Sequence, residues 1–412
     1  MKRLLLLNYA FLSVFIAQVV VILDIVQSIF DVNFPILRYF LYFLAAYYLI
    51  KAVRKNAIKI PILIHQNIVL VFFLSWIILL LLASIPQLFD GYRNYIKFKQ
   101  FLSGLGYIYL ISFFAILKPN LLYYRNLLKF SLILAIVYLF ITIPLFNYFT
   151  VSHSNQGEEY GTVFAAGASI LLLTFSYHSK RVNMITVVTA LLVLVVNMLL
   201  ARRNQVLYFS SVLFFSYCLY FFHKSVYRRK SKLKAIIPSS ILLLFVCVLF
   251  YVNIDQFSLL LERTQTGMES REHIVDLFFN DFNSHPKDWI FGRGVFGEFQ
   301  GGILATDEST GLRDTIENGY LYLILKGGWI YLGLFIILSS KAMYNGFKKS
   351  KNLLCKAFAG IILIYFIDMI GFGLPSSTLR YVIVFIAIGG CYSNELLQCT
   401  DEFLSSKIGL KL

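Results

Sequence analysis

Long apolar runs alternate with short polar stretches along nearly the whole chain. A helix needs about 20 apolar residues to cross the hydrocarbon core of a bilayer, and most of the runs approach that length. We count about twelve such runs, of which several are short for a span. The predicted spans are Leu4 to Leu23, Ile36 to Ile50, Ile68 to Ile85, Phe101 to Leu117, Leu127 to Phe146, Thr162 to Tyr177, Met184 to Leu200, Val206 to Phe222, Ala235 to Val252, Ile316 to Leu338, Phe358 to Gly373 and Tyr381 to Tyr392. The pattern therefore predicts an all-α polytopic membrane protein with about twelve transmembrane helices.

One long polar interruption breaks this pattern, from about Asn253 to Asp314. It divides the chain into residues 1–252 with nine predicted spans, the polar loop 253–314, and residues 315–412 with three spans and a tail. Within the loop, apolar residues recur at helical spacing between Ser270 and Phe282, which predicts a short amphipathic helix. The glycines between Gly292 and Gly302 predict loop or turn conformations after it.

Composition supports the membrane assignment. Of 412 residues, 59% are hydrophobic and only 14% are charged, which excludes an ordinary soluble globular protein. The N-terminal Met1-Lys2-Arg3 and the leucines after it resemble a signal peptide, but no small-residue cleavage site follows. We therefore expect the first apolar run to be retained as a helix.

The formal net charge of +16 is distributed by loops. Lys and Arg gather in every second predicted loop, at 51–59, 118–129, 180–181, 224–234 and 341–351. This alternation follows the positive-inside rule, so it predicts two cytoplasmic termini and argues against nucleic-acid binding. The polar loop then lies outside the cytoplasm, and between Asp255 and Asp314 eleven acidic residues against five basic ones give a net charge of −6.

No cysteine or histidine pattern points to a metal or a disulfide framework. The five cysteines all lie in predicted spans or on the cytoplasmic side, and His153, His273 and His285 lack the spacing of metal ligands. Asp24 and Asp31 could hold a metal, but we interpret them as polar loop residues. We expect no cofactor.

Arg202 and Arg203 are placed against the charge rule, at the outer end of the seventh predicted span. Such charges usually face a cavity lined by protein, and guanidinium groups bind phosphate through paired hydrogen bonds. The alternatives are contact with lipid head groups or an ion pair with an acid such as Glu158. We favour anion binding.

Two further residues at the loop could carry chemistry. Arg271 opens the predicted loop helix, where a cation opposes the helix dipole; it either pairs with Glu269 or Asp276 or binds substrate. Glu317 lies where the tenth span meets the outer surface, so it is either a solvated helix-end residue or a partly desolvated general base.

Three separated motifs in the second half of the chain carry a family resemblance. They are Ala201-Arg202-Arg203, then Ser270-Arg271 with His285-Pro286 and Ile290-Phe291-Gly292-Arg293-Gly294, and Asn318-Gly319-Tyr320-Leu321. With the predicted topology they resemble the O-antigen polymerase and O-antigen ligase superfamily of bacterial inner-membrane glycosyltransferases, whose fold is GT-C-like. Ligases of that superfamily usually have histidine before this asparagine. Glu317 stands there instead, which favours a polymerase.

The resemblance implies a glycan donor carried on undecaprenyl diphosphate and an acceptor sugar hydroxyl on the outer face of the membrane. It implies a metal-independent, inverting transfer in which Arg202, Arg203 and Arg271 stabilise the departing diphosphate and Glu317 is the base. Further substrate contacts are expected from Arg293, His285, Asn318 and Tyr320. The lipid bilayer and a chain-length regulator are the other candidate partners.

Two alternative functions remain open on the sequence. A ligase would transfer finished glycan to lipid A-core. A lipid-linked glycan flippase would carry inverted repeats and charges at the bilayer midplane, where Asp368 is the main charged residue that we identify.

Overall fold

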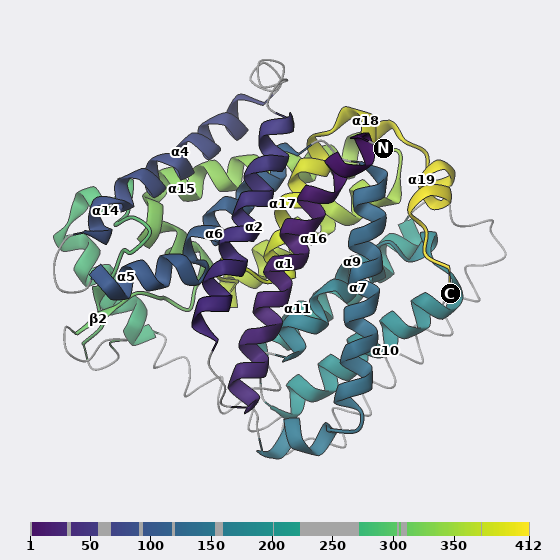
Figure 1. Ribbon diagram of the computed structural model, residues 1–412, viewed down its shortest axis with the longest axis horizontal. Coiled ribbons are helices and arrows are strands. Elements are labelled where there is room, and N and C mark those ends of the chain that lie inside the picture. Colours follow the sequence, from purple (N-terminus) through teal and green to yellow (C-terminus); the bar gives the residue numbers. More distant parts are fainter. Residues whose placement is uncertain are drawn as a thin grey trace.

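Helices make up nearly all of the structure, a computed structural model that describes residues 2–30, 34–56, 67–89, 94–117, 120–152, 160–200, 202–222, 272–302, 305, 311–371 and 373–411 (Figure 1). Eight of the described helices are long and apolar enough to cross a membrane, and two shorter apolar helices cover Tyr160–Leu173 and Leu379–Tyr392. The chain is therefore an all-α, multi-pass membrane protein. The ninth predicted span, Ala235 to Val252, lies outside the described residues, so the count of twelve stays a prediction.

The helices follow the predicted spans closely. The longer ones are α1 (Lys2–Phe30), α2 (Pro35–Asn56), α4 (Ile68–Ser84), α7 (Leu121–Thr142), α9 (Ala166–Leu173), α10 (Lys180–Leu199), α11 (Arg203–Phe222), α15 (Gly319–Tyr344), α16 (Leu353–Gly371) and α17 (Leu379–Tyr392). The short ones are η2 (Pro86–Leu88), α5 (Asn94–Gln100), η3 (Phe101–Leu105), α6 (Gly106–Leu110), η4 (Ile111–Ile116), η5 (Tyr148–Ser152), η6 (Phe175–Tyr177), α14 (Pro286–Phe291), η10 (Asn345–Lys349), α18 (Asn394–Gln398) and α19 (Asp401–Ile408).

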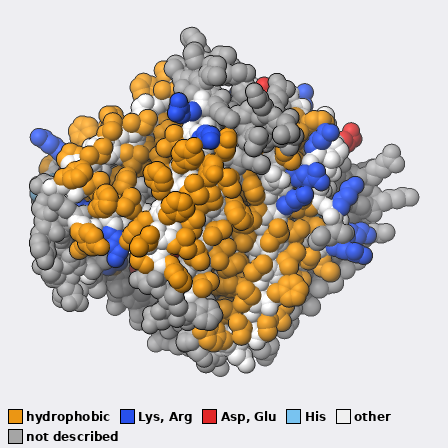
Figure 2. Space-filling view, in the orientation of Figure 1, with side chains coloured by type: hydrophobic (Ala, Val, Ile, Leu, Met, Phe, Trp, Pro, Cys, Tyr) orange, Lys and Arg blue, Asp and Glu red, His pale blue; other side chains and the backbone are white. Residues whose placement is uncertain are grey.

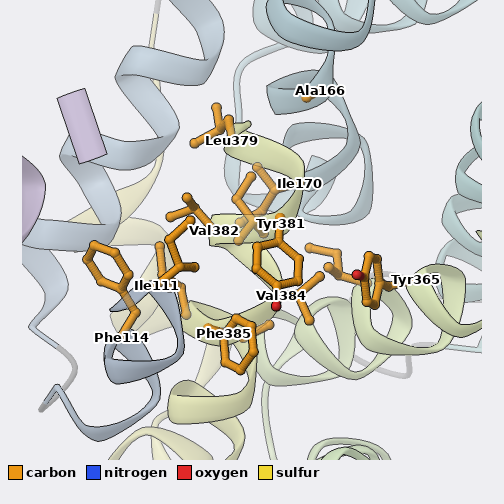
Figure 3. Close-up of a cluster of buried hydrophobic side chains, with 14 of the residues drawn as sticks. Ile111, Phe114, Ala166, Ile170, Tyr365, Leu379, Tyr381, Val382, Val384 and Phe385 are labelled. Atoms are coloured by element: carbon orange, nitrogen blue, oxygen red, sulfur yellow. The ribbon is translucent and has the colours of Figure 1, made fainter. Parts of the chain in front are cut away.

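Helix α17 lies at the centre of the packing. All of its residues from Leu379 to Cys391 are buried, as expected for an apolar helix surrounded by other helices. Figure 3 shows its side chains between Ile111 and Phe114 of η4 on one side and Tyr365 of α16 on the other. The rings of Tyr381 and Phe385 meet edge to face, with 5.2 Å between their centres.

The outer surface of the bundle is apolar. Ile36 is 81% exposed, Phe140 77% and Phe43 68%, which is costly in water but favourable against lipid tails. Figure 2 shows apolar side chains across the middle of one face, with most Lys and Arg side chains toward its margins. This distribution supports the membrane assignment independently of helix length.

The described part of the polar loop folds against the bundle. The predicted amphipathic helix is confirmed for residues 272–284, and it buries Ile274, Phe278 and Phe282. The two-residue strands β1 (Phe299–Gln300) and β2 (Leu312–Arg313) then pair antiparallel. Residues 272–302 are called the loop segment below. Its residues Val295, Phe296 and Glu298 line the cavity described below, together with Tyr322 and Lys326 of α15.

The C-terminal segment is fastened to the turn before α10. The backbone N–H of Leu410 donates to Nδ1 of His178 over 3.3 Å, and Nε2 of His178 lies 3.0 Å from Oγ1 of Thr174. Because a backbone N–H can only donate, Nδ1 must be the unprotonated nitrogen. Ser179 N also donates to the Leu410 carbonyl over 2.9 Å. The neutral form of His178 is therefore part of this attachment.

We expect the attachment to weaken in acid. Burial lowers the pKa of His178 to about 4, from about 6.5 in an unfolded chain. This contribution to stability is complete above pH 6.5 and decreases as the pH falls toward 4, by up to about 3 kcal/mol. Hydrogen exchange of residues 400–411 should accelerate between pH 7 and pH 4.5 relative to the intrinsic rate. His178→Gln should remove most of this pH dependence of exchange. His273→Gln, which changes an exposed histidine, should retain it. Equal slopes in both variants would contradict the assignment.

Candidate functional site

Helix α15 is broken at Gly328, where the backbone has φ 68° and ψ −173°. The glycine turn predicted after the loop helix fits into this break. The N–H groups of Arg293 and Gly294 donate to the carbonyls of Leu325 and Lys326 over 2.8 and 3.0 Å. The Trp76 indole N–H donates to the Gly327 carbonyl over 3.1 Å. Carbonyls freed by the break thus find new donors, as buried polar groups within a membrane must.

Glycine is required on both sides of this contact. A Cβ at Gly292 would lie 2.5 Å from the Gly327 nitrogen, and a Cβ at Gly328 would overlap the Ile290 carbonyl. The two backbones touch only because neither residue has a side chain. The stretch Ile290-Phe291-Gly292-Arg293-Gly294 is therefore a turn whose backbone approaches a helix closely.

Arg293 holds the loop segment together. Its guanidinium donates to Asp288 over 2.6 Å, to Asp281 over 2.6 Å and to the Glu298 carbonyl over 2.7 Å. Burial opposes ionisation of Asp281, but hydrogen bonds from Arg293 and the Gln300 N–H outweigh burial and keep the pKa of Asp281 below its usual range. The guanidinium also lies 4.7 Å from the centre of the Phe282 ring. Each of its nitrogens already has a partner.

A cavity of about 330 Å³ lies between the loop segment, α15 and the first helices of the chain. Its volume is within the range of small-ligand sites. Carboxylates, cations, hydroxyls and aromatic rings share its wall. The lining residues are Val21, Asp24, Arg38, Tyr42, Lys97, Gln100, Ser103, Gly104, Leu105, Ile108, Val295, Phe296, Glu298, Asp314, Thr315, Tyr322, Lys326, Ser376 and Ser377.

Lys326 is the most deeply buried cation of the cavity, with 3% of the residue exposed. Its Nζ donates to the Gly297 carbonyl over 2.8 Å and lies 5.2 Å from the centre of the Tyr322 ring. An ammonium within a membrane-spanning helix is costly, and such residues usually face a protein-lined cavity. Lys326 lies beside the break in α15 and lines the same cavity as Glu298 and Asp314.

The residues predicted at the start of α15 lie beside the cavity but do not line it. Oε1 of Glu317 is 4.0 Å from the Arg313 guanidinium, and its side chain is 38% exposed. Asn318 caps the helix by accepting from the N–H groups of Tyr320 and Leu321 over 3.0 and 3.1 Å. The Tyr320 hydroxyl donates to the Phe366 carbonyl over 2.8 Å. Of this region, Asp314 and Thr315 face the cavity instead.

The predicted arginine cluster is only partly described. The Arg202 N–H donates to the Asn197 carbonyl over 2.8 Å, at the turn between α10 and α11. Arg271 and the side chain of Arg203 lie outside the described residues. His285 lies beside Arg293, with 3.4 Å between its Nδ1 and the guanidinium, and 60% of its side chain is exposed. The predicted substrate roles of these residues stay predictions.

A buried ion pair lies near the turn between α10 and α11. Asp368 of α16 pairs with Arg380 of α17, and the Arg380 guanidinium lies 3.5 Å from the centre of the Tyr208 ring of α11. The carboxylate and the guanidinium are 1% and 9% exposed. The pair joins three helices in an apolar interior.

Of the charged residues that line the cavity, sequence reasoning named only Asp24, which it interpreted as a polar loop residue. Lys326 had a readable signal, because it is a lysine inside the tenth predicted span. Arg38 had a weaker one, as a cation at the outer end of the second span. For Glu298 and Asp314, nothing distinguished them from the other acids of the loop.

Comparison with known proteins adds no identification. No protein-family model, no curated protein and no solved structure matches the chain. The family resemblance therefore rests on the three sequence motifs. Within the described ranges, no group of three or more His, Cys, Asp or Glu is placed to hold a metal ion.

Proposed function

We propose that this protein is a polysaccharide polymerase of the cytoplasmic membrane. It transfers glycan from undecaprenyl diphosphate to an acceptor sugar hydroxyl on the outer face. The observation that supports this most is the mixed lining of the cavity. Carboxylates, amides and hydroxyls bond sugar hydroxyls, aromatic rings such as Phe296 and Tyr322 offer stacking surfaces, and cations favour a phosphate-bearing donor.

The proposed reaction needs no metal. The acceptor oxygen attacks the anomeric carbon from the face opposite the diphosphate, so the configuration inverts. The bond between that carbon and the diphosphate oxygen breaks, and the leaving group keeps its electron pair. The hydroxyl proton passes to a carboxylate. Cations around the diphosphate stabilise the charge that develops on it.

Three carboxylates are candidates for the general base. Glu317 is the candidate from the sequence motif, but Glu298 and Asp314 line the cavity, where their charges act on the Lys326 ammonium. A base must lie within hydrogen-bond reach of the proton that it accepts. The position on the cavity wall favours Asp314 and Glu298 over Glu317.

The test is polymerisation by the purified protein from an undecaprenyl-diphosphate-linked repeat unit. We expect Asp314→Asn or Glu298→Gln to lower the rate about 100-fold or more, the usual loss for a general base. Glu402→Gln, an exposed acid on α19, is the matched control and should leave the rate unchanged.

Two results would reject the proposal. Wild-type protein that forms no longer chains but caps added lipid A-core would be a ligase. Wild-type protein that forms no glycosidic bond and moves the lipid-linked glycan across vesicles would be a flippase.

A further inference from the structure

The open side of the cavity lies between α2 and α5. Among the lining residues, Arg38, Lys97 and Gln100 are partly or largely exposed, whereas Tyr42, Phe296 and Lys326 are buried. The first group therefore marks the mouth and the second the floor. Helix α5 runs crosswise to α2 (Figure 1), because the chain turns at Gly104, where φ is 122°.

The mouth is bordered by side chains suited to the membrane boundary. On α5, Tyr95 is 75% exposed and Ile96 54%, and Lys97 and Lys99 flank Phe98, which is 46% exposed. On α2, Ile36 is 81% exposed and Phe40 58%. Aromatic and basic side chains on a helix that crosses the spans are typical of an interfacial segment, whose apolar atoms meet acyl chains while its cations meet head groups.

The cations at the mouth retain unused donors. A terminal nitrogen of Arg38 lies 3.2 Å from the Ser103 carbonyl and 3.4 Å from Asp24, but its buried Nε has no hydrogen-bond partner. Lys97 forms no ion pair with another described residue. At the floor, Lys326 bonds one neutral carbonyl and has two further N–H groups. Arg38 has Asp24 beside it and Lys326 has Asp314 and Glu298, so Lys97 is the cation of the cavity whose charge is not compensated by a described carboxylate. Its ammonium and the Arg38 Nε are available to an anion.

We propose that the mouth between α2 and α5 is the docking site for the diphosphate of an isoprenoid-diphosphate lipid. Arg38 and Lys97 hold the diphosphate, and Lys326 contacts it from the floor. The isoprenoid chain runs outward along the exposed apolar side chains of α2 and α5. The glycan then extends into the cavity toward Glu298 and Asp314. This assigns donor binding to the first half of the chain, and it rests on the proposed function.

Charge decides between this occupant and a neutral one. Of the three carboxylates that line the cavity, Asp24 lies 3.4 Å from Arg38 at the mouth, and the charges of Glu298 and Asp314 act on Lys326. The mouth beside Lys97 is therefore the most favourable place for a negative group. A phosphate there would accept from both a guanidinium and an ammonium, which form the stronger class of hydrogen bond.

The test measures binding of polyprenyl diphosphate without glycan to the full-length protein in nanodiscs of neutral lipid. We expect Arg38→Gln and Lys97→Gln each to weaken binding about tenfold, and the double variant about a hundredfold. Lys99→Gln is the matched control, because Lys99 is on the same short helix but does not line the cavity; it should change binding less than twofold. If Arg38→Gln fails to fold, Lys97→Gln alone decides.

The outcomes separate this inference from the proposed function. Unchanged binding in the double variant, or an equal loss in Lys99→Gln, overturns the docking site even if the wild-type protein polymerises. If the wild type binds the lipid and the double variant does not, the docking site is supported. If the wild type in addition forms no polymer, the polymerase is rejected while the docking site stands. Polyprenyl alcohol should not compete; inorganic pyrophosphate that competes as well as the lipid would overturn a lipid ligand.

Discussion

Gly328→Ala is expected to disrupt the junction between the loop segment and α15. Gly328 has φ 68° and ψ −173°, a region that is essentially restricted to glycine and costs other residues about 1–3 kcal/mol. A methyl group there would in addition overlap the Ile290 carbonyl. We expect a loss of more than about 3 kcal/mol in the free energy of unfolding, with separation of the glycine turn from α15. Thermal unfolding in detergent measures the effect.

Gly333→Ala is the matched control, because it lies in the same helix and its Cβ would meet no atom within 4 Å. Alanine in a helix interior is about 0.5–1 kcal/mol more favourable than glycine, so this variant should be at least as stable as the wild type. Equal stability of the two variants would show that the break in α15 does not hold the two backbones together.

The second large effect is expected at the buried ion pair. Asp368→Leu leaves the Arg380 guanidinium buried without its carboxylate, and Arg380→Met leaves the carboxylate without its cation. Loss of one member of a buried pair costs about 3–5 kcal/mol. The double change Asp368→Leu with Arg380→Met should be much less destabilising than the sum, because no uncompensated charge remains.

A double-mutant cycle in unfolding experiments measures this coupling. Strict additivity would mean that the two residues do not act as a pair. A stable double variant that fails to polymerise would instead assign the pair a role in the reaction rather than in folding. The Tyr208 ring, which the Arg380 guanidinium covers, stays unchanged in every arm of the cycle.

The helices were predictable because lipid imposes a simple rule on each segment. Every predicted span within the described residues is helical, although the span Phe101 to Leu117 is broken at Gly104 and consists of three short elements. The spacing of Ile274, Phe278 and Phe282 predicted the short helix of the loop. These are local properties, in which apolar length and periodicity decide the outcome. The break at Gly328 was not predicted, because a glycine pair inside an apolar run also fits an unbroken helix.

The cavity was not predictable in the same way, because its wall is assembled from distant parts of the chain. Lys326 bonds to Gly297, 29 residues earlier, while Arg38 lies nearly three hundred residues before it and lines the same space. The family resemblance implied that Arg293 contacts substrate. In the structure the Arg293 guanidinium is bound by Asp281 and Asp288, which lie 12 and 5 residues before it in the chain.

The break in α15 also determines what the protein's intrinsic fluorescence can report. All three tryptophans of the chain lie at this one junction. Trp76 donates to the Gly327 carbonyl, and the rings of Trp289 and Trp329 stack across the two elements with centres 6.2 Å apart. Tryptophan emission is therefore a local probe. It reports whether the loop segment is packed against α15 and does not report on the rest of the bundle.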